Sequence, residues 1–469
     1  MKHDTAIRVF RQAVRHHLEY NMRHQPCLLS VYRALTLAAS IAAYPAARGA
    51  GPPHKAASRF GRYPKVYVPD TAGPRLWLHA SSVGEAEAAR PLFDALSLRF
   101  PRAAFVVSTG TPHGYKRAEA LFEGAATVVP APLDFPRSVK NALDSFHPHA
   151  LILLETELWP NWIMEAAKRG CAVALVNGRI SARSVGRYVA LKSLFAPVFE
   201  RMSVFSMIAA EDAARIRKMG APKNLIRISG NAKYDALDEK ARRGPDEGVK
   251  RLLGNLGGPV FVAGSTRTGE EEAACFAFSR MLAEFPAARL ILAPRHVERA
   301  SAVESVLHSF GLSFDRLSDL SASGRPFSAP ALLVDRMGPL FSLYWASDFA
   351  FLGGSLVPKG GHNVLEPAAW AKPVLFGPHT EDFSEAASLL IKTGGGIRVK
   401  SAGELASAAL DLCRNPGNAE LMGQKARKAL FAHQGAADRH AQAVADVLNS
   451  PSKNANCCVA LQSQFRHVP

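Results

Sequence analysis

Short apolar runs alternate with amphipathic stretches along this chain from Pro64 onward. This alternation is typical of parallel strands connected by helices that cover both faces of a sheet. A first series of runs predicts strands at Arg75–Ala80, Ala104–Ser108, Ala126–Val129, Ala150–Leu154, Ala172–Val176 and Val204–Ala209. A second series predicts strands at Val260–Ala263, Arg289–Ala293, Ala331–Val334, Phe349–Leu352 and Pro373–Phe376. The predicted fold class is therefore α/β, with two Rossmann-like domains facing a cleft.

The length of 469 residues, with 48% hydrophobic composition, suffices for two cores of ordinary domain size. The charged, glycine-rich stretch Asp238–Gly258 is the natural linker between them. We therefore predict an N-terminal domain over residues 51–245 and a C-terminal domain over residues 246–450. Residues 451–469 lack hydrophobic periodicity and are expected to form a disordered tail.

The front of the chain is strongly basic. Residues 1–65 hold eleven Lys and Arg against two acidic residues, a net +9 of the chain's +17. The stretch Cys27 to Tyr44 has Arg33 as its single charge and reaches the lower limit of length for crossing a bilayer. Before it, apolar residues recur at helical spacing and predict a basic amphipathic helix: Ile7, Phe10, Val14 and Leu18. We expect residues 1–50 to anchor the chain to an anionic membrane, either as one span or lying on its surface.

Two other interpretations of this segment are a cleaved signal peptide and a nucleic-acid-binding arm. The stretch before the apolar run is long for a signal peptide. The arginines flank an apolar segment instead of alternating with aromatic residues, so no nucleic-acid partner is predicted. The six cysteines show neither metal-ligand spacing nor the density of a disulfide framework, which favours a reducing compartment.

A glycine-rich loop and a short helix lie between the predicted strands near Phe349 and Phe376. Its glycines would let the backbone approach a ligand, and a helix opening near Asn363 would direct N–H groups at a phosphate. Glu366, in the first turn, could accept two ribose hydroxyls. The alternative is a tight turn between buried strands. The four glycines concerned are Gly353, Gly354, Gly360 and Gly361.

Carboxylates follow two strands of the first series. Glu85 comes directly after Gly84 where a strand meets a helix, so it is either an exposed base or an ordinary acidic helix start. The helix N-terminus should keep it ionised. Glu155 and Glu157 follow the most apolar strand, where burial requires a partner and a structural salt bridge is the alternative for one of them.

Several common motifs are absent from the sequence. Neither GxxxxGK[ST], GxGxxG nor HExxH occurs, which argues against a P-loop enzyme, a dinucleotide dehydrogenase and a zinc protease. No Asp-x-Asp pair offers a metal clamp, so no metal site is predicted.

Seven segments occur in an order and spacing that resemble the 3-deoxy-D-manno-oct-2-ulosonic acid (Kdo) transferases of lipopolysaccharide synthesis, from about Val31 to Val399. The segments are Ser82–Glu85, Glu155–Asn161, Asn177–Ser181, Gly230–Asp235, Gly264–Thr266, Pro294–His296 and Gly353–Pro367. The resemblance implies a GT-B fold and an N-terminal anchor in the inner membrane, with the catalytic domains cytoplasmic. It also implies CMP-Kdo as donor, a lipid A precursor (lipid IVA) as acceptor, and no cofactor.

The same resemblance implies roles for individual residues. Glu85 would be the general base, with Glu155 and Lys233 supporting the transition state of an inverting displacement. CMP would be held by Pro294 and Arg295, by Met337, Gly338 and Pro339, and by Asn363, Val364, Leu365 and Glu366. Arg295 also has the chemistry of a charge-assisted phosphate clamp. The chain departs from the family at Arg267, where His is usual, and at Asp382, where Asn is usual.

Three other functions remain open from the sequence. A GT-B glycosyltransferase that uses a UDP-sugar and a nucleotide-sugar epimerase could both share the fold. A membrane-surface protein without catalysis is the third, because a fold alone does not establish activity.

Overall fold

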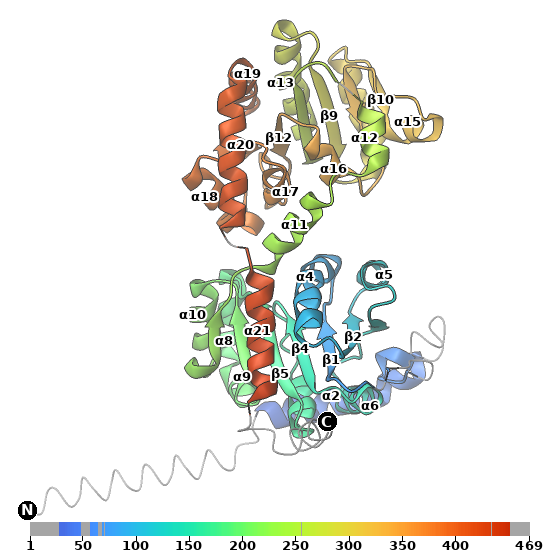
Figure 1. Ribbon diagram of the computed structural model, residues 1–469, viewed down its shortest axis with the longest axis vertical. Helices are drawn as coiled ribbons and strands as arrows, with labels where there is room; N and C mark the ends of the chain where they lie inside the picture. The colour runs from blue at the N-terminus through green and yellow to red at the C-terminus, as the bar shows by residue number, and fades with distance from the viewer. Residues whose placement is uncertain are drawn as a thin grey trace, which may run out of the picture. The chain divides into compact units, whose positions relative to one another are not determined.

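The computed structural model describes residues 28–47, 57–63, 68–69, 71–254, 256–432 and 434–450. The chain divides into two compact units, each with its own sheet (Figure 1). Unit 1 consists of the described residues up to Lys233 together with those from Gly435 onward, and unit 2 is Tyr234–Gln434. Each unit is an α/β fold, as predicted.

The sheet of unit 1 is wholly parallel, with strand order β3-β2-β1-β4-β5-β6-β7. The strands are β1 Arg75–His79, β2 Ala104–Thr109, β3 Thr127–Pro130, β4 Ala150–Leu154, β5 Ala172–Gly178, β6 Val204–Met207 and β7 Ile226–Ile228. Side chains alternate between the faces, so Trp77 enters one core while Leu76 and Leu78 enter the other. Both faces are therefore buried under helices, as parallel sheets require.

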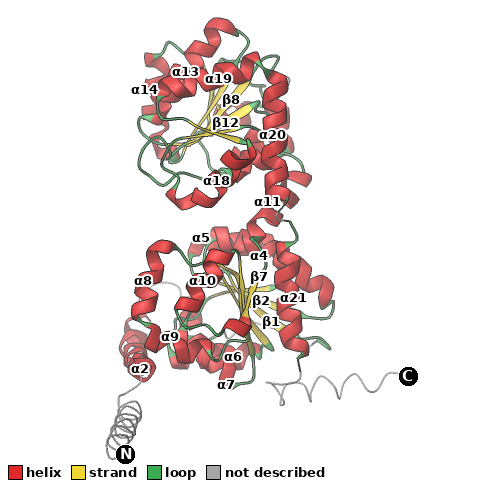
Figure 2. Ribbon diagram, turned by 90° about the vertical axis from the view of Figure 1, so that its left-hand side faces the viewer, coloured by secondary structure: helices red, strands yellow, loops and turns green. Residues whose placement is uncertain are grey.

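The helices of unit 1 cover these two faces (Figure 2). They are α2 Leu28–Ala47, α4 Val83–Arg99, α5 Pro112–Leu121, α6 Pro136–Phe146, α7 Pro160–Lys168, α8 Ala182–Ala190, α9 Lys192–Phe199, α10 Ala210–Lys218 and α21 Ala436–Asn449, with the 3-10 turn η1 Lys223–Leu225. Helix α21, the last of the described chain, packs on α4, β5 and β6 (Figure 1). Its Ala441, Ala443 and Val444 belong to the core beneath α4.

The sheet of unit 2 is also parallel, with order β10-β11-β9-β8-β12-β13-β14. Its strands are β8 Val260–Thr266, β9 Arg289–Pro294, β10 Phe314–Arg316, β11 Ala331–Leu333, β12 Phe349–Leu352, β13 Val374–Phe376 and β14 Gly396–Arg398. Along β8, Phe261 and Val262 enter opposite cores. In Figure 2 its strands lie between layers of helix.

The helices of unit 2 connect these strands. They are α11 Ala232–Arg242, α12 Glu247–Leu253, α13 Glu270–Glu284, α14 Ala300–Ser309, α15 Leu317–Ser323, α16 Leu340–Trp345, α17 Leu365–Ala369, α18 Ser384–Thr393, α19 Ala402–Arg414 and α20 Pro416–Phe431. The 3-10 turns η2 Val297–Arg299 and η3 Glu381–Phe383 complete the unit. Helix α11 begins in unit 1 and continues into unit 2.

The units differ from the predicted domains in two places. The division falls between Lys233 and Tyr234, before the predicted boundary at residue 245. The expected linker Asp238–Gly258 holds the last five residues of α11 and all of α12. The predicted C-terminal domain ran to residue 450, whereas α21 belongs to unit 1. The predicted tail, residues 451–469, and the basic helix before Cys27 lie outside the described residues.

Helix α2 covers much of the predicted anchor. Its Leu29 joins the core of unit 1, Tyr32 donates a 2.7 Å hydrogen bond to Asp134 Oδ2, and Arg33 forms an ion pair with Glu165. The opposite side is apolar and exposed: Leu28, Val31, Leu35 and Ile41. Within the described part of the chain, no helix has the length and apolar character needed to cross a bilayer.

Candidate functional site

Glu85 lies in the first turn of α4, directly after strand β1. The Ser82 hydroxyl caps this helix by accepting a hydrogen bond from Glu85 N–H, and it donates a 3.0 Å hydrogen bond to Glu85 Oε1. Ser81 N–H donates to Glu85 Oε2 at 2.8 Å. The helix start therefore holds the carboxylate in one orientation at the carboxyl edge of the sheet.

The environment makes Glu85 a stronger base than its helix position alone suggests. Burial, followed by the charges of Glu157 and Glu155, raises the pKa of Glu85 above its usual value. The hydrogen bonds from Ser81 and Ser82 act against this rise but do not cancel it. Burial and the two neighbouring carboxylates therefore act against the helix N-terminus, which was expected to favour the ionised form of Glu85. A carboxylate with raised pKa is better suited to accept a proton.

Both neighbouring carboxylates have partners, and those of Glu157 are His79 and Trp159. Its Oε2 lies 3.3 Å from His79 Nε2 and accepts a hydrogen bond from Trp159 Nε1. Burial raises the pKa of Glu157, but the hydrogen bond and charge of His79 and the hydrogen bond from Trp159 leave it below its usual value. Glu157 is thereby held ionised beside Glu85 and helps to raise the pKa of that base.

His79 is buried, and its orientation is fixed from the other side of the ring. Its Nδ1 lies 3.1 Å from the carbonyl oxygen of Ser108 and 3.0 Å from the hydroxyl oxygen of the same residue. The ring also packs on Trp162 with a centroid separation of 4.8 Å. His79 was not among the residues predicted for the site. Its position at the end of β1, pointing to the same face as Trp77, was the available signal.

Glu155 and Lys233 form an ion pair with Nζ and Oε1 2.5 Å apart. Glu155 follows β4 and has φ of 54°, a left-handed conformation that costs energy in a residue with a Cβ. Lys233 lies at the start of α11, where Asn177 Oδ1 accepts a hydrogen bond from Ala232 N–H at 2.9 Å. The structure thus gathers the predicted residues Glu85, Glu155 and Lys233 at one edge of unit 1.

A buried histidine from the end of the chain supports this edge. His440 Nε2 lies 2.9 Å from the Gly230 carbonyl oxygen, and Nδ1 lies 2.7 Å from Ser206 Oγ. Burial, with a smaller contribution from Arg439, lowers the pKa of His440 to about 4, so the ring is neutral near pH 7. His440 ties α21 to the segment that leads to Lys233. The sequence did not indicate this contact, because residues 230 and 440 are far apart in the chain and come together only in the folded protein.

In unit 2, a buried carboxylate holds the glycine-rich loop after β12 through hydrogen bonds to the loop backbone. The buried carboxylate of Glu270 accepts hydrogen bonds from the N–H groups of Gly354, Ser355 and Leu356, at 2.6, 2.9 and 2.9 Å. The N–H group of Gly354 is therefore committed to Glu270 inside the protein. Glu270 begins α13 amid other acidic residues, and nothing in the sequence distinguished it from a solvated helix start.

The glycines of the loop are needed because backbone packs closely on backbone or side chain. A Cβ at Gly353 would lie 2.4 Å from the Ser265 carbonyl oxygen, and one at Gly360 would lie 2.5 Å from Asp382 Oδ2. The loop leads into helix α17, which has five residues. The side chains of Val364 and Leu365, at the start of this helix, lie in the core of unit 2, so only the backbone of these two residues can contact a ligand.

The other residues predicted to hold CMP follow strands of the same sheet. Arg295 comes directly after β9 with an exposed side chain, and its N–H donates to the Thr266 carbonyl oxygen at 3.0 Å. Met337 is 67% exposed and precedes Gly338, whose φ is 114°. Because the strands are parallel, their carboxyl ends share one edge, and these loops belong to it.

Asn363 and Glu366 belong to the same edge. Asn363 Oδ1 accepts from Leu365 N–H at 3.2 Å, and its amide nitrogen lies 3.5 Å from Glu366 Oε1. Both side chains are partly exposed at this edge.

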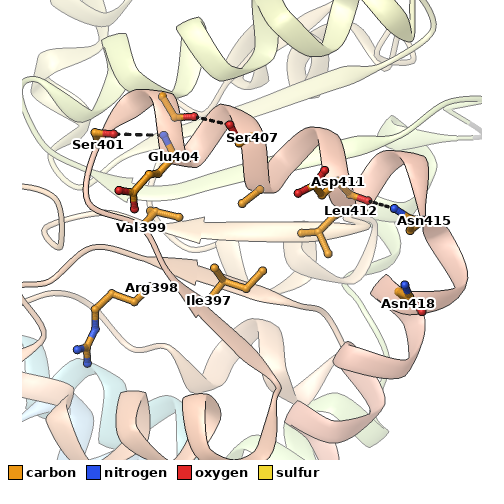
Figure 3. A pocket seen from close by; sticks show the side chains of 12 residues that line it. Ile397, Arg398, Val399, Ser401, Glu404, Ser407, Asp411, Leu412, Asn415 and Asn418 are labelled. Atoms are coloured by element: carbon orange, nitrogen blue, oxygen red, sulfur yellow. Dashed lines mark hydrogen bonds between the residues drawn. The ribbon is translucent and has the colours of Figure 1, made fainter.

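A separate pocket of about 720 Å³ lies along β14 and α19 in unit 2 (Figure 3). Figure 3 shows Glu404 and Asp411 on α19, with Asn415 and Asn418 at the start of α20. None of the predicted site residues lines this pocket. Among the side chains that the structure describes, no three His, Cys, Asp or Glu residues are grouped so that they could hold a metal ion.

Two linked parallel-sheet units of this kind define a two-domain fold that solved nucleotide-sugar enzymes share. A crystal structure of a UDP-N-acetylglucosamine 2-epimerase matches 80% of this chain and 95% of its own, with a TM-score of 0.56 and 15% identity. At that identity the likeness concerns the fold alone.

The family is shown by sequence. Residues 54–236 match the family model of 3-deoxy-D-manno-octulosonic-acid transferase (kdotransferase). The 3-deoxy-D-manno-octulosonic acid transferase of Haemophilus influenzae is 34% identical over 388 residues, covering 82% of this chain and 89% of that protein. The protein of the same name from Bordetella pertussis is 33% identical, covering 84% and 92%. The chain therefore belongs to the 3-deoxy-D-manno-octulosonic acid transferases, a family of glycosyltransferases.

Proposed function

We propose that this protein transfers Kdo from CMP-Kdo to a hydroxyl group of a lipid A precursor, lipid IVA, in lipopolysaccharide synthesis. The observation that carries the proposal is Glu85, held by Ser81 and Ser82 and given a raised pKa, in a chain of this family. A general base of this kind is what a glycosyltransferase needs to activate an acceptor hydroxyl.

Unit 1 would supply the chemistry. The Glu85 carboxylate takes the proton of the acceptor hydroxyl while that oxygen attacks the anomeric carbon of Kdo. The bond between that carbon and the phosphate oxygen of CMP breaks, and the electron pair leaves with CMP. Single displacement inverts the anomeric centre. Lys233, oriented by Glu155 at 2.5 Å, places a positive charge at the same edge, where it would stabilise developing negative charge.

Unit 2 would bind the donor in a GT-B arrangement. Arg295 is an exposed guanidinium at the carboxyl edge of the sheet and suits the CMP phosphate. Asn363 and Glu366 offer an amide and a carboxylate to the nucleoside, and Met337–Pro339 would lie beside it. The leaving group would be neutralised by side chains of the protein, without a cofactor or a bound metal.

The N-terminal helix would hold the enzyme on an anionic membrane, where its lipid acceptor resides. Helix α2 turns Tyr32 and Arg33 toward unit 1 and leaves Leu28, Val31, Leu35 and Ile41 exposed. An apolar face of this kind favours contact with acyl chains, and the basic residues before it favour anionic headgroups. We propose that this membrane is the inner membrane and that both units are cytoplasmic.

Mass spectrometry of the lipid product tests the proposal. The protein is incubated with CMP-Kdo and a bis-phosphorylated lipid A precursor, and the expected product is heavier by one or more Kdo residues, with CMP released. In a parallel thermal-shift measurement, CMP should raise the melting temperature and UDP should not. A shift with UDP alone and no Kdo-bearing lipid would instead favour an enzyme that uses UDP-sugars.

A further inference from the structure

Unit 2 contains a cluster of basic side chains with two buried nitrogen atoms that lack partners. Arg267 follows β8, His296 follows β9, and His362 lies in the loop after β12. Arg267 Nη1 lies 2.6 Å from His296 Nε2. Arg267 Nε and His362 Nε2 are both buried without a hydrogen-bond partner. A buried donor left unpaired costs stability, so its retention calls for a ligand or a function.

The acidic groups nearest in the chain are committed elsewhere. The two oxygens of Glu270 accept from four backbone N–H groups, one of them that of Arg267 at 2.9 Å. Glu271 forms an ion pair with Arg299 and accepts from Thr266 Oγ1. Neither carboxylate is therefore free to neutralise the Arg267 guanidinium, and the cluster keeps its positive charge.

His362 experiences this charge directly. Burial and then the charges of Arg295, Arg267 and His296 lower the pKa of His362 to about 4. The imidazole is consequently neutral near pH 7. Its ring packs against Gly354, where a Cβ would lie 3.3 Å from Nε2, so the ring has little freedom to turn away. A neutral ring with an uncommitted Nε2, beside a guanidinium with an uncommitted Nε, forms a receptor for a small planar anion.

We propose that Arg267 and His362 form a carboxylate subsite that recognises the acid group of the transferred sugar. The inference rests on the proposed function, since an octulosonic acid carries a carboxylate on its anomeric carbon. In a CMP-linked donor the same carbon also carries the phosphate ester, so two anionic groups are separated by one carbon atom. Two adjacent cationic contacts are then required: Arg295 for the phosphate, and Arg267 with His362 for the carboxylate.

The guanidinium geometry suits this assignment. Nε–H and a terminal N–H of arginine donate in parallel to the two oxygens of a carboxylate, and His362 Nε2 can add a third hydrogen bond when it is protonated in that tautomer. The carboxylate stays on the sugar when CMP departs. The subsite would therefore select acidic sugars over neutral ones without affecting affinity for the nucleotide alone.

Calorimetric titration of the full chain with CMP and with freshly prepared CMP-Kdo tests the subsite. Arg267→Ala and, separately, Arg267→Lys should weaken CMP-Kdo roughly tenfold to a hundredfold, as expected for a lost hydrogen bond to a charged group, and leave CMP within twofold. His362→Ala should act in the same direction. Arg295→Ala should weaken both ligands. Arg280→Ala, an exposed arginine on α13, is the matched control and should weaken neither.

The outcomes separate the subsite from the function on which it rests. Retained CMP binding shows that a variant is folded, and Arg267→Lys keeps the charge if Arg267→Ala does not fold. Unchanged CMP-Kdo affinity in Arg267→Lys and His362→Ala, or equal loss of CMP and CMP-Kdo affinity, would overturn the subsite and leave the Kdo transferase activity standing. A wild-type protein that binds UDP and neither CMP nor CMP-Kdo would overturn both.

Discussion

At the scale of single residues, the proposed role of Glu85 as general base can be tested by one substitution. Glu85→Gln keeps the size of the side chain and one acceptor but removes the ability to take a proton. We expect turnover to fall at least about 100-fold, within the range for loss of general-base catalysis. CMP affinity should stay unchanged, because the residues proposed to hold CMP all come from unit 2. Single-turnover rates and calorimetry on the same sample measure both quantities.

The matched control for Glu85→Gln is Glu87→Gln on the same helix, where the carboxylate pairs with Arg117. That change should leave turnover within about twofold. If Glu85 is only an acidic helix start, its replacement should cost at most about 1 kcal/mol of stability and little activity. Near-normal turnover of folded Glu85→Gln would remove it from the mechanism and make Glu155 or Glu157 the next base to test.

At the scale of secondary-structure elements, α21 makes the stability of unit 1 depend on pH through His440. The pKa of a free histidine is 6.5, while that of buried His440 is about 4. Between these values the unfolded chain binds a proton that the folded chain does not, so stability falls as the pH falls. The difference between the pKa values of the unfolded and folded states lowers the free energy of unfolding by about 3 kcal/mol by pH 4.

Chemical denaturation at several pH values between 7.5 and 4.5 tests this dependence. His440→Gln should be less stable at pH 7.5, because Gln replaces a ring that packs between Ser206 and Gly230, and should lose stability less steeply toward acid pH. His113→Gln, at an exposed position on α5, should keep the wild-type slope. An unchanged slope in His440→Gln would show that other groups govern the acid sensitivity.

Helix α2 yields a second prediction at this scale. Leu35 and Ile41 are 65% and 59% exposed, so replacing both with Glu should leave the melting temperature nearly unchanged. The proposed membrane contact should weaken at least tenfold, because two apolar side chains no longer enter the bilayer. Co-sedimentation with vesicles containing phosphatidylglycerol measures this. Leu421→Glu, at an exposed leucine on α20, should sediment as wild type does. Equal sedimentation of the double variant would contradict the contact.

At the scale of the whole molecule, hydrophobic pattern predicted most of the fold because central strands are buried on both faces. The strands it missed, β7, β10 and β14, each have three residues and lie at sheet edges. Such strands bury too little to leave a pattern. The glutamates and Lys233 were found because their motifs are local. Glu270, His79 and His440 were not, since their roles depend on partners that only the fold brings near.

After unit 2 the chain returns to unit 1 at Gly435, and we expect the stability of unit 1 to depend on this last segment. Helix α21 supplies Ala441, Ala443 and Val444 to a core of unit 1 and His440 to the segment before Lys233. A chain that ends at Gln434 loses these contacts, worth several kcal/mol, which is comparable with the whole stability of a domain. Hydrogen exchange should then show loss of protection in β1, β4, β5 and β6.

Unit 2 keeps all its residues in this truncated chain, so CMP should still bind with nearly wild-type affinity, although transfer activity should disappear. A chain that ends at Ser450 retains α21 and serves as the control, with protection and activity expected to stay as in the full chain. If the shorter chain instead kept the protection of unit 1 and lost CMP binding, α21 would act on unit 2, in agreement with the domain bounds 246–450 predicted from the sequence. The comparison therefore decides which unit depends on the end of the chain for its stability.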